Sequence, residues 1–185
     1  KAGVQKVHIL EYATRLLPRQ LDEKGSMVLQ HHLESEGLIV KTGIHVTGID
    51  NVQSIGVHPV SDQIQVHTET QPFMGQSVIL AAGVTPNVSL AKDSGLKVQR
   101  GIVVDNTMAT SVPDIYALGD CVEFENKTWG IIPAALEQCS IAASHICNKE
   151  KKYYKGTVPS TRLESGNLSI LSKGKIDLSP EEVNS

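Results

Sequence analysis

Three short stretches carry residues that could bind a nucleotide, each where an apolar segment ends. Glu11 ends the apolar part of "KVHILEYA", Gly83 ends "VILAAG", and Gly119 with Asp120 ends "DIYALGD". A carboxylate accepts hydrogen bonds from sugar or polyol hydroxyls, and a glycine lets a ligand approach the backbone closely. Each position has an ordinary alternative, because an acidic residue at a strand end is commonly solvated or starts a turn. The residues alone therefore leave binding and structural roles open.

The elements around these positions follow the order of an α/β fold. Strands are expected in "KVHILE", "LIVKTG", "SVILAAG", "GLKVQRGIVVD" and "DIYALGD", and helices in "LDEKGSMVLQHHLESEG" and "IPAALEQCSIAASHICNK". Their apolar runs do not alternate strictly with polar residues, which favours buried parallel strands. The stretch from His45 to Thr70 instead alternates in short segments with turn residues between them, which predicts a small antiparallel β meander.

Local signals fix the ends of the expected helices. Asp22 precedes the first helix as a plausible N-cap, and Gly37 follows it where a left-handed residue commonly ends a helix. Leu29 and Leu33 fall on one face at helical spacing. Pro133 suits the first turn of the second helix, because its missing N–H has no partner to lose there.

The bulk composition excludes several classes of protein. The chain has 185 residues, 40% of them hydrophobic, and a net charge of −3, which gives no electrostatic case for nucleic acid or an anionic membrane. No apolar run reaches the roughly 20 residues that a membrane-spanning helix needs. Cys121, Cys139 and Cys147 form no CxxC pair, so neither a disulfide framework nor a metal site is expected. A cytoplasmic protein is the expectation.

The order of the motifs resembles one family. "LEYA", "AAGVTPN" and "TSVPDIYALGD" follow one another as in the FAD- and NAD(P)H-dependent pyridine nucleotide-disulfide oxidoreductase family, and the resemblance covers about residues 1–162. Within the family, "EYATRLLPRQLDEKGSMVLQ" and "KGTVPST" are most similar to the NADH nitrite reductases. The NADH–rubredoxin and ferredoxin reductases are the next most similar.

The resemblance implies parts of two Rossmann-like nucleotide-binding domains with the antiparallel meander, followed by the start of a small α+β interface domain. Residues 1–92 match the C-terminal part of the NAD-binding domain, 93–150 the C-terminal segment of the FAD-binding domain, and 151–185 the interface domain. The family's glycine-rich FAD and NAD turns would precede Lys1.

The resemblance also implies an FAD-binding role for four residues. Asp120 would accept hydrogen bonds from the FAD ribitol, and Gly119 would let the backbone approach it. The N–H groups near Ala135 and Leu136, at the N-terminus of the second helix, would favour the negative charge of reduced flavin. No side chain resembles a general base, so no catalytic residue is assigned.

Two residues are assigned to NAD on the same basis. Glu11 would bind the adenosine ribose, and Gly83 would lie beside the nicotinamide nucleotide. A carboxylate about 4 Å from a 2′-phosphate is repelled by about 4 kcal/mol at an effective dielectric of about 20, which favours NADH over NADPH. Arg15 would soften this repulsion if the segment after Glu11 were helical.

The implied function is transfer of hydride from NADH to FAD, with electrons passing to an iron–sulfur or sirohaem module for nitrite reduction. Rubredoxin or ferredoxin is the alternative acceptor, and a homodimer is left open. A non-catalytic remnant is the alternative from another class. Because the glycine-rich turns are absent, residues 1–185 alone are expected to hold no flavin and to be inactive.

Overall fold

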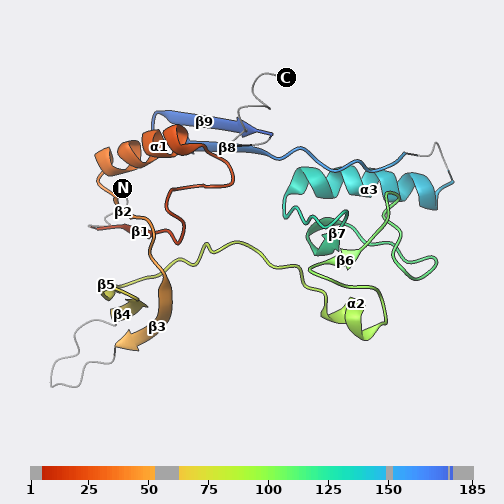
Figure 1. The fold of residues 1–185 in the computed structure, drawn as a ribbon, viewed down its shortest axis with the longest axis horizontal. Helices are drawn as coiled ribbons and strands as arrows, with labels where there is room; N and C mark the ends of the chain where they lie inside the picture. Colours follow the sequence, from red (N-terminus) through yellow and green to blue (C-terminus); the bar gives the residue numbers. More distant parts are fainter. Residues whose placement is uncertain (1–5, 53–62, 149–151, 175, 177–185) are drawn as a thin grey trace. The chain divides into compact units, whose positions relative to one another are not determined.

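The computed structural model of the chain describes residues 6–52, 63–148, 152–174 and 176 (Figure 1). The chain forms two compact units. Unit 1 consists of Lys1–Leu80 together with Ser160–Ser185, and unit 2 consists of Ala81–Pro159. Among the described residues, no helix has both the length and the apolar character needed to cross a membrane.

Unit 1 contains a parallel strand pair that is joined through a helix. Strand β1 (His8–Leu10) pairs with β2 (Ile39–Lys41), so that Ile9 lies opposite Val40. Helix α1 (Glu23–Ser35) connects the two strands. Parallel strands need such a crossover, and this β–α–β arrangement was predicted from the sequence. It places Glu11 directly after the end of β1.

Helix α1 begins and ends at the predicted residues. The Asp22 carboxylate accepts a hydrogen bond of 2.7 Å from the Gly25 N–H, which satisfies one of the free donors of the first turn. Gly37, just beyond the last turn, has φ +85°, a left-handed conformation that glycine adopts without strain. Leu29, 2% exposed, faces a core that also contains Leu21.

The predicted antiparallel meander is confirmed within the described residues. Strand β4 (Gln63–Thr68) pairs on one side with β3 (Val46–Val52) and on the other with β5 (Phe73–Gly75), both antiparallel. The connection from 53 to 62, which was predicted to be part of the meander, lies outside the described residues.

A β hairpin near the C-terminus completes the core of unit 1. Strands β8 (Ser160–Ser165) and β9 (Leu168–Lys173) are antiparallel, and their exposure alternates residue by residue. The inward side chains Leu163, Leu168 and Ile170 pack against the cluster around Leu29. The hairpin is also tied to α1, because His32 Nε2 lies 2.8 Å from the carbonyl oxygen of Ser165.

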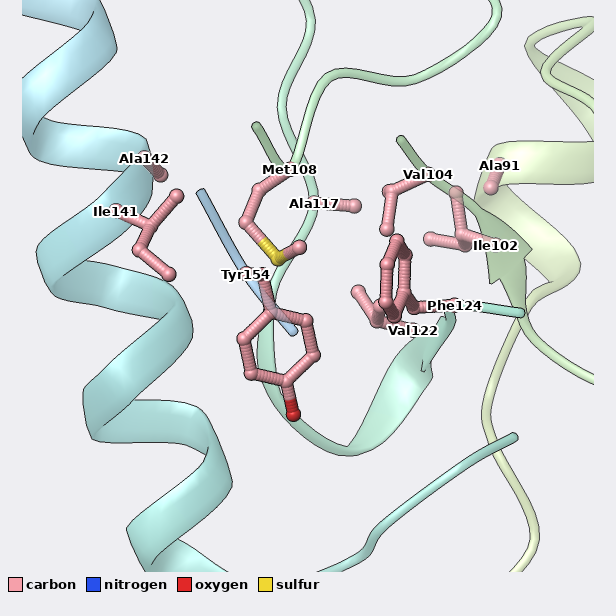
Figure 2. Packing of buried hydrophobic residues seen from close by; sticks show 10 residues of the cluster. All are labelled: Ala91, Ile102, Val104, Met108, Ala117, Val122, Phe124, Ile141, Ala142 and Tyr154. Carbon is pink, nitrogen blue, oxygen red and sulfur yellow. The ribbon is translucent and has the colours of Figure 1, made fainter. Parts of the chain in front are cut away.

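Unit 2 is built around one long helix and a second parallel strand pair. Helix α3 (Ile132–Ile146) and the strands β6 (Ile102–Val103) and β7 (Val122–Glu123) enclose its core. Figure 2 shows ten apolar side chains filling this core, with Ile141 and Ala142 from α3 on one side and Ala91 from α2 (Ser89–Asp93) on the other. The short helix α2 was not predicted.

Three of the predicted strands are wrong or shortened. Residues 77–83 form no strand, and Ile79 and Leu80 are 90% and 76% exposed. The segment 114–119 makes only one bridge, between Tyr116 and Ala109, and 95–105 contributes only β6 and a bridge from Val98. A strand exists only when a neighbour accepts its hydrogen bonds, and no described residue pairs with 77–83. Hydropathy alone does not reveal whether that neighbour is present.

The α/β class that was predicted from the sequence is nevertheless confirmed. Each unit contains a parallel strand pair, connected through helix α1 in unit 1 and followed by helix α3 in unit 2, and the expected antiparallel meander lies in unit 1. The division into NAD-binding, FAD-binding and interface domains stays a prediction.

Candidate functional site

The residues singled out at 119 and 120 form a tight turn in unit 2. Gly119, Asp120 and Cys121 make one turn of 3₁₀ helix, η1 (Gly119–Cys121), and the Val122 N–H closes it on the Gly119 carbonyl oxygen. Gly119 has φ +84°, so a residue with a side chain would be strained there. Asp120 is exposed, and within the described part of the chain its carboxylate accepts no hydrogen bond. Both of its oxygens therefore remain open to a ligand.

A glutamine that was missed at the sequence level holds this turn. The Gly119 N–H donates to Gln138 Oε1 at 2.7 Å, and Gln138 is 1% exposed. Its Nε2 is buried and has no hydrogen-bond partner among the described residues, which costs about 1–3 kcal/mol. A signal was available, because Gln138 lies on the same stripe of α3 as the buried Ala134, Ile141 and Ala142.

The turn lies against the first turn of α3. A Cβ atom built on Gly119 would stand 3.9 Å from the Cβ of Ala135. The prediction that the Ala135 N–H is free at the helix terminus is wrong, because it donates to the Ile131 carbonyl oxygen at 3.3 Å. Leu136 lies one residue deeper in the helix.

The free donors of α3 therefore lie a residue or two earlier than expected. The N-cap residue and the first three residues of a helix have no intrahelical acceptor for their N–H groups. Pro133 has no N–H, which leaves those of Ile132 and Ala134. The side chains of Ile132 and Leu136 beside them are 75% and 67% exposed. Donors with positive character thus lie next to an exposed apolar surface.

These groups suit three features of a ligand. An open carboxylate suits the hydroxyls of a polyol, and a helix N-terminus suits a neighbouring group that acquires negative charge. The exposed apolar side chains suit a flat ring system. FAD combines these three features, so the residues present fit its ribitol and isoalloxazine portions. No acid–base pair lies among them, which agrees with a site that positions reactants.

A second polar chain joins α3 to the segment that follows it. Thr157 Oγ1 donates to Glu137 Oε2 at 2.6 Å and lies 2.7 Å from the Tyr154 hydroxyl. The Trp129 indole N–H donates to the Thr157 carbonyl oxygen at 2.9 Å. Tyr154 is 2% exposed and its ring packs on those of Phe124 and Trp129. The segment is therefore fixed to the helix that carries the candidate site.

In unit 1, Glu11 has one oxygen occupied. Its Oε1 accepts a hydrogen bond of 2.8 Å from the Ala13 N–H, so the carboxylate closes a turn directly after β1. The segment after Glu11 is not helical. The condition under which Arg15 was expected to soften the repulsion between Glu11 and a 2′-phosphate is therefore not met. The Arg15 guanidinium donates to the carbonyl oxygens of Leu21 and Pro18, both at 3.3 Å. It is thus engaged with the local backbone.

His8 lies on the strand that leads to Glu11. Its Nδ1 is buried without a hydrogen-bond partner among the described residues, and its ring packs against that of Phe73 in a T-shaped arrangement. Burial, followed by the charges of Lys6 and Lys41, lowers the pKa of His8 below 6.5. His8 is therefore a neutral packing residue at pH 7.

Gly83 belongs to unit 2, the unit that also contains Gly119. It has φ +90°, and a Cβ built on it would meet nothing within 4 Å. The next residue, Val84, packs closely on Gly130, where an added Cβ would come within 2.9 Å of Val84 Cγ2. The space expected around Gly83 is present, and its contact with a nicotinamide stays a prediction.

The cysteines and histidines form no metal site among the described residues, which contain no group of three or more candidate ligands. Cys121 donates from its thiol to the Leu118 carbonyl oxygen at 3.4 Å, and Cys139 and Cys147 are exposed free thiols. All three cysteines are free thiols.

Together the fold and the site define a nucleotide-binding α/β protein with a Gly-Asp turn beside a helix N-terminus. The family model described as pyridine nucleotide-disulphide oxidoreductase matches residues 1–143. The chain belongs to this family, which uses FAD and NAD(P)H.

Individual relatives agree with this assignment. A nitrite reductase [NAD(P)H] of Bacillus subtilis is 32% identical over 179 residues, covering 95% of this chain and 21% of the relative. An NADH-rubredoxin oxidoreductase of Clostridium acetobutylicum is 34% identical over 169 residues, covering 91% of this chain and 38% of the relative. The chain thus spans well under half the length of either protein.

A solved structure shows the same fold. The crystal structure of an FAD-dependent pyridine nucleotide-disulphide oxidoreductase from Desulfovibrio vulgaris superimposes with a TM-score of 0.77 at 29% identity. The match covers 91% of this chain and 42% of that one.

Proposed function

We propose that the chain is the part of a flavoprotein oxidoreductase that binds the ribitol end of FAD and the adenosine ribose of NADH. The whole protein would pass hydride from NADH to FAD and then deliver electrons to an acceptor for nitrite reduction. One observation carries the flavin assignment. The turn at Gly119 is packed on the first turn of α3 while the Asp120 carboxylate stays exposed and unbonded in the described chain.

Each residue of this chain has a positioning task in the proposal. Asp120 would accept hydrogen bonds from ribitol hydroxyls, and Gly119 would keep side chains away from them. The first turn of α3, from Ile132 to Leu136, would face the pyrimidine side of the ring and favour negative charge there. The bound FAD would supply the hydride-accepting and electron-delivering chemistry.

Glu11 would set the choice of nicotinamide nucleotide. Its Oε1 is used by the Ala13 N–H, and its other oxygen would accept from the adenosine ribose. A 2′-phosphate would meet the same carboxylate and be repelled. Since the Arg15 guanidinium is bound to backbone carbonyl groups of its own loop, NADH is the proposed donor. Gly83 would leave room beside the nicotinamide half.

The acceptor is proposed from the relatives. Nitrite reduction, through an iron–sulfur or sirohaem module, follows the relative named a nitrite reductase. Rubredoxin or ferredoxin is the second candidate, favoured by a relative of 34% identity that is named an NADH-rubredoxin oxidoreductase. In either case residues 1–92 would belong to the NAD-binding domain, 93–150 to the FAD-binding domain and 151–185 to the interface domain.

The test is an anaerobic titration of the full-length protein. Purified protein reconstituted with FAD should lose its visible flavin absorbance on addition of NADH and respond far less to NADPH. Nitrite and rubredoxin should then be offered separately, and reoxidation of the flavin recorded. A full-length protein that binds neither FAD nor NADH would support the non-catalytic alternative and overturn the proposal.

A further inference from the structure

The side chain of Gln138 is the one polar group on the buried face of α3. Its neighbours on that face, Ala134, Ile141 and Ala142, are apolar and buried. At 1% exposure, Gln138 is closed off from bulk solvent. Within the described chain its amide makes one hydrogen bond, accepting from the Gly119 N–H at 2.7 Å.

The direction of the amide is fixed by its partner. A backbone N–H can only donate, so the atom facing Gly119 must be the amide oxygen. Nε2 then points elsewhere, and no described group accepts from it. A methionine of similar size would fill the same space without an unsatisfied donor. Core stability alone would favour such a side chain, so the glutamine is better explained by the bond to Gly119.

The hydrogen bond between Gly119 and Gln138 joins the turn to α3 at the residue directly before Asp120. Within the turn, Val122 donates to the Gly119 carbonyl oxygen and Cys121 to that of Leu118. Among the described residues, Gln138 supplies the side-chain hydrogen bond that joins this turn to α3. Asp120 is the next residue along the chain, and its carboxylate is held by no bond of its own in the described chain.

We propose that Gln138 is the positioning residue of the candidate flavin site. By holding the Gly119 N–H against α3, it fixes the Asp120 carboxylate relative to the free N–H groups of Ile132 and Ala134. The distance between the Asp120 carboxylate, which would accept from the ribitol, and the N-terminus of α3 is then fixed before FAD binds. This inference rests on the proposed function, since it gives the turn its flavin-binding purpose.

Three variants of the full-length protein test it. Gln138→Met removes the acceptor at nearly constant volume, and Gln138→Glu restores an oxygen that can face Gly119. Gln99→Met makes the same chemical change at an exposed position of unit 2 and is the matched control. The first readout is hydrogen exchange of the Gly119 amide in the flavin-free protein, resolved by fragmentation mass spectrometry. The second is the FAD dissociation constant, with kcat and KM for NADH measured separately.

Gln138→Met should exchange the Gly119 amide at least about tenfold faster and bind FAD about tenfold more weakly, with thermal stability retained or raised. KM for NADH should stay unchanged, Gln138→Glu should recover most of both losses, and Gln99→Met should match the wild type. Unchanged Gly119 exchange or unchanged FAD affinity in Gln138→Met would overturn the inference. So would equal losses in both Gln138 variants. A wild-type protein that binds no FAD would instead refute the proposed function.

Discussion

At the scale of single residues, the site depends on which hydrogen-bonding groups are already used. Glu11 and Asp120 are both acidic residues near strand or segment ends, yet Glu11 has one oxygen on the Ala13 N–H and Asp120 has none engaged in the described chain. The Ala135 N–H is used within α3, and that of Gly119 is used by Gln138. The sequence shows where these residues lie along the chain but not which of their groups remain open.

Replacing Asp120 by asparagine should weaken FAD binding by the full-length protein. A hydrogen bond to a charged group contributes about 1.5–3 kcal/mol, which corresponds to about a tenfold to hundredfold increase in the dissociation constant. Asparagine keeps one oxygen that can accept a hydrogen bond, so an increase of the dissociation constant near the lower end of this range, about tenfold, is expected. Fluorescence titration with FAD measures the change. Asp93→Asn, an exposed site at the end of α2, removes the same charge and should leave binding unaltered.

Replacing Glu11 by glutamine should narrow the preference for NADH. The amide oxygen can still accept from the Ala13 N–H, so the turn after β1 should persist, while the repulsion of a 2′-phosphate is lost. The ratio of kcat/KM for NADH to that for NADPH should fall by one to three powers of ten, the range given by up to about 4 kcal/mol. An unchanged ratio would show that Glu11 does not face the ribose. Glu36→Gln, an exposed residue beyond α1, is the control.

At the scale of elements, helices were predicted better than strands. Asp22, Gly37 and Pro133 mark helix ends through local chemistry, and the structure confirms all three. The strands expected at 77–83 and 114–119 failed, because a strand depends on a neighbour that its own residues do not specify. Gln138 was missed for a related reason, since its partner Gly119 lies 19 residues away.

The cap of α1 offers a direct test of unit 1. Asp22→Ala should reduce the free energy of unfolding by about 1 kcal/mol, because the Gly25 N–H loses its acceptor. Urea denaturation followed by circular dichroism measures the loss. Asp22→Asn keeps an oxygen that can accept from Gly25 and should lose only a small part of it. Equal losses in the two variants would mean that charge at the helix N-terminus dominates.

At the scale of the whole molecule, large apolar side chains of the described chain are exposed in both units. Four of these side chains are largely exposed: Ile79 at 90%, Leu80 at 76%, Ile132 at 75% and Leu136 at 67%. Large apolar side chains exposed to this degree commonly mark surfaces that are covered by a partner or ligand. The curated relatives, of which this chain covers 21% and 38%, have room for such a covering segment.

Polypeptide 1–185 should therefore hold no flavin when purified by itself. The Asp120 interaction, at about 1.5–3 kcal/mol, and the helix terminus, at about 0.3–1 kcal/mol, fall short of the roughly 8 kcal/mol that micromolar affinity requires. The absorbance spectrum of the purified polypeptide, before and after incubation with FAD and gel filtration, tests this. Stoichiometric yellow flavin in the polypeptide would contradict the prediction.

The division of the chain into units also bears on the order in which the protein is completed during synthesis. Unit 1 is made of two stretches of the chain, Lys1–Leu80 and Ser160–Ser185, and the second of these contains the hairpin β8–β9. Unit 2, Ala81–Pro159, lies between them in the sequence. Domains generally fold as units while the ribosome extends the chain. Unit 2 can close as soon as Tyr154 has emerged, but Leu29 and Val40 must wait for Leu163 and Ile170 before their core is covered. Within this chain, unit 1 can thus complete its core only after unit 2 has been translated, and its uncovered apolar face is the one that a nascent-chain chaperone would meet.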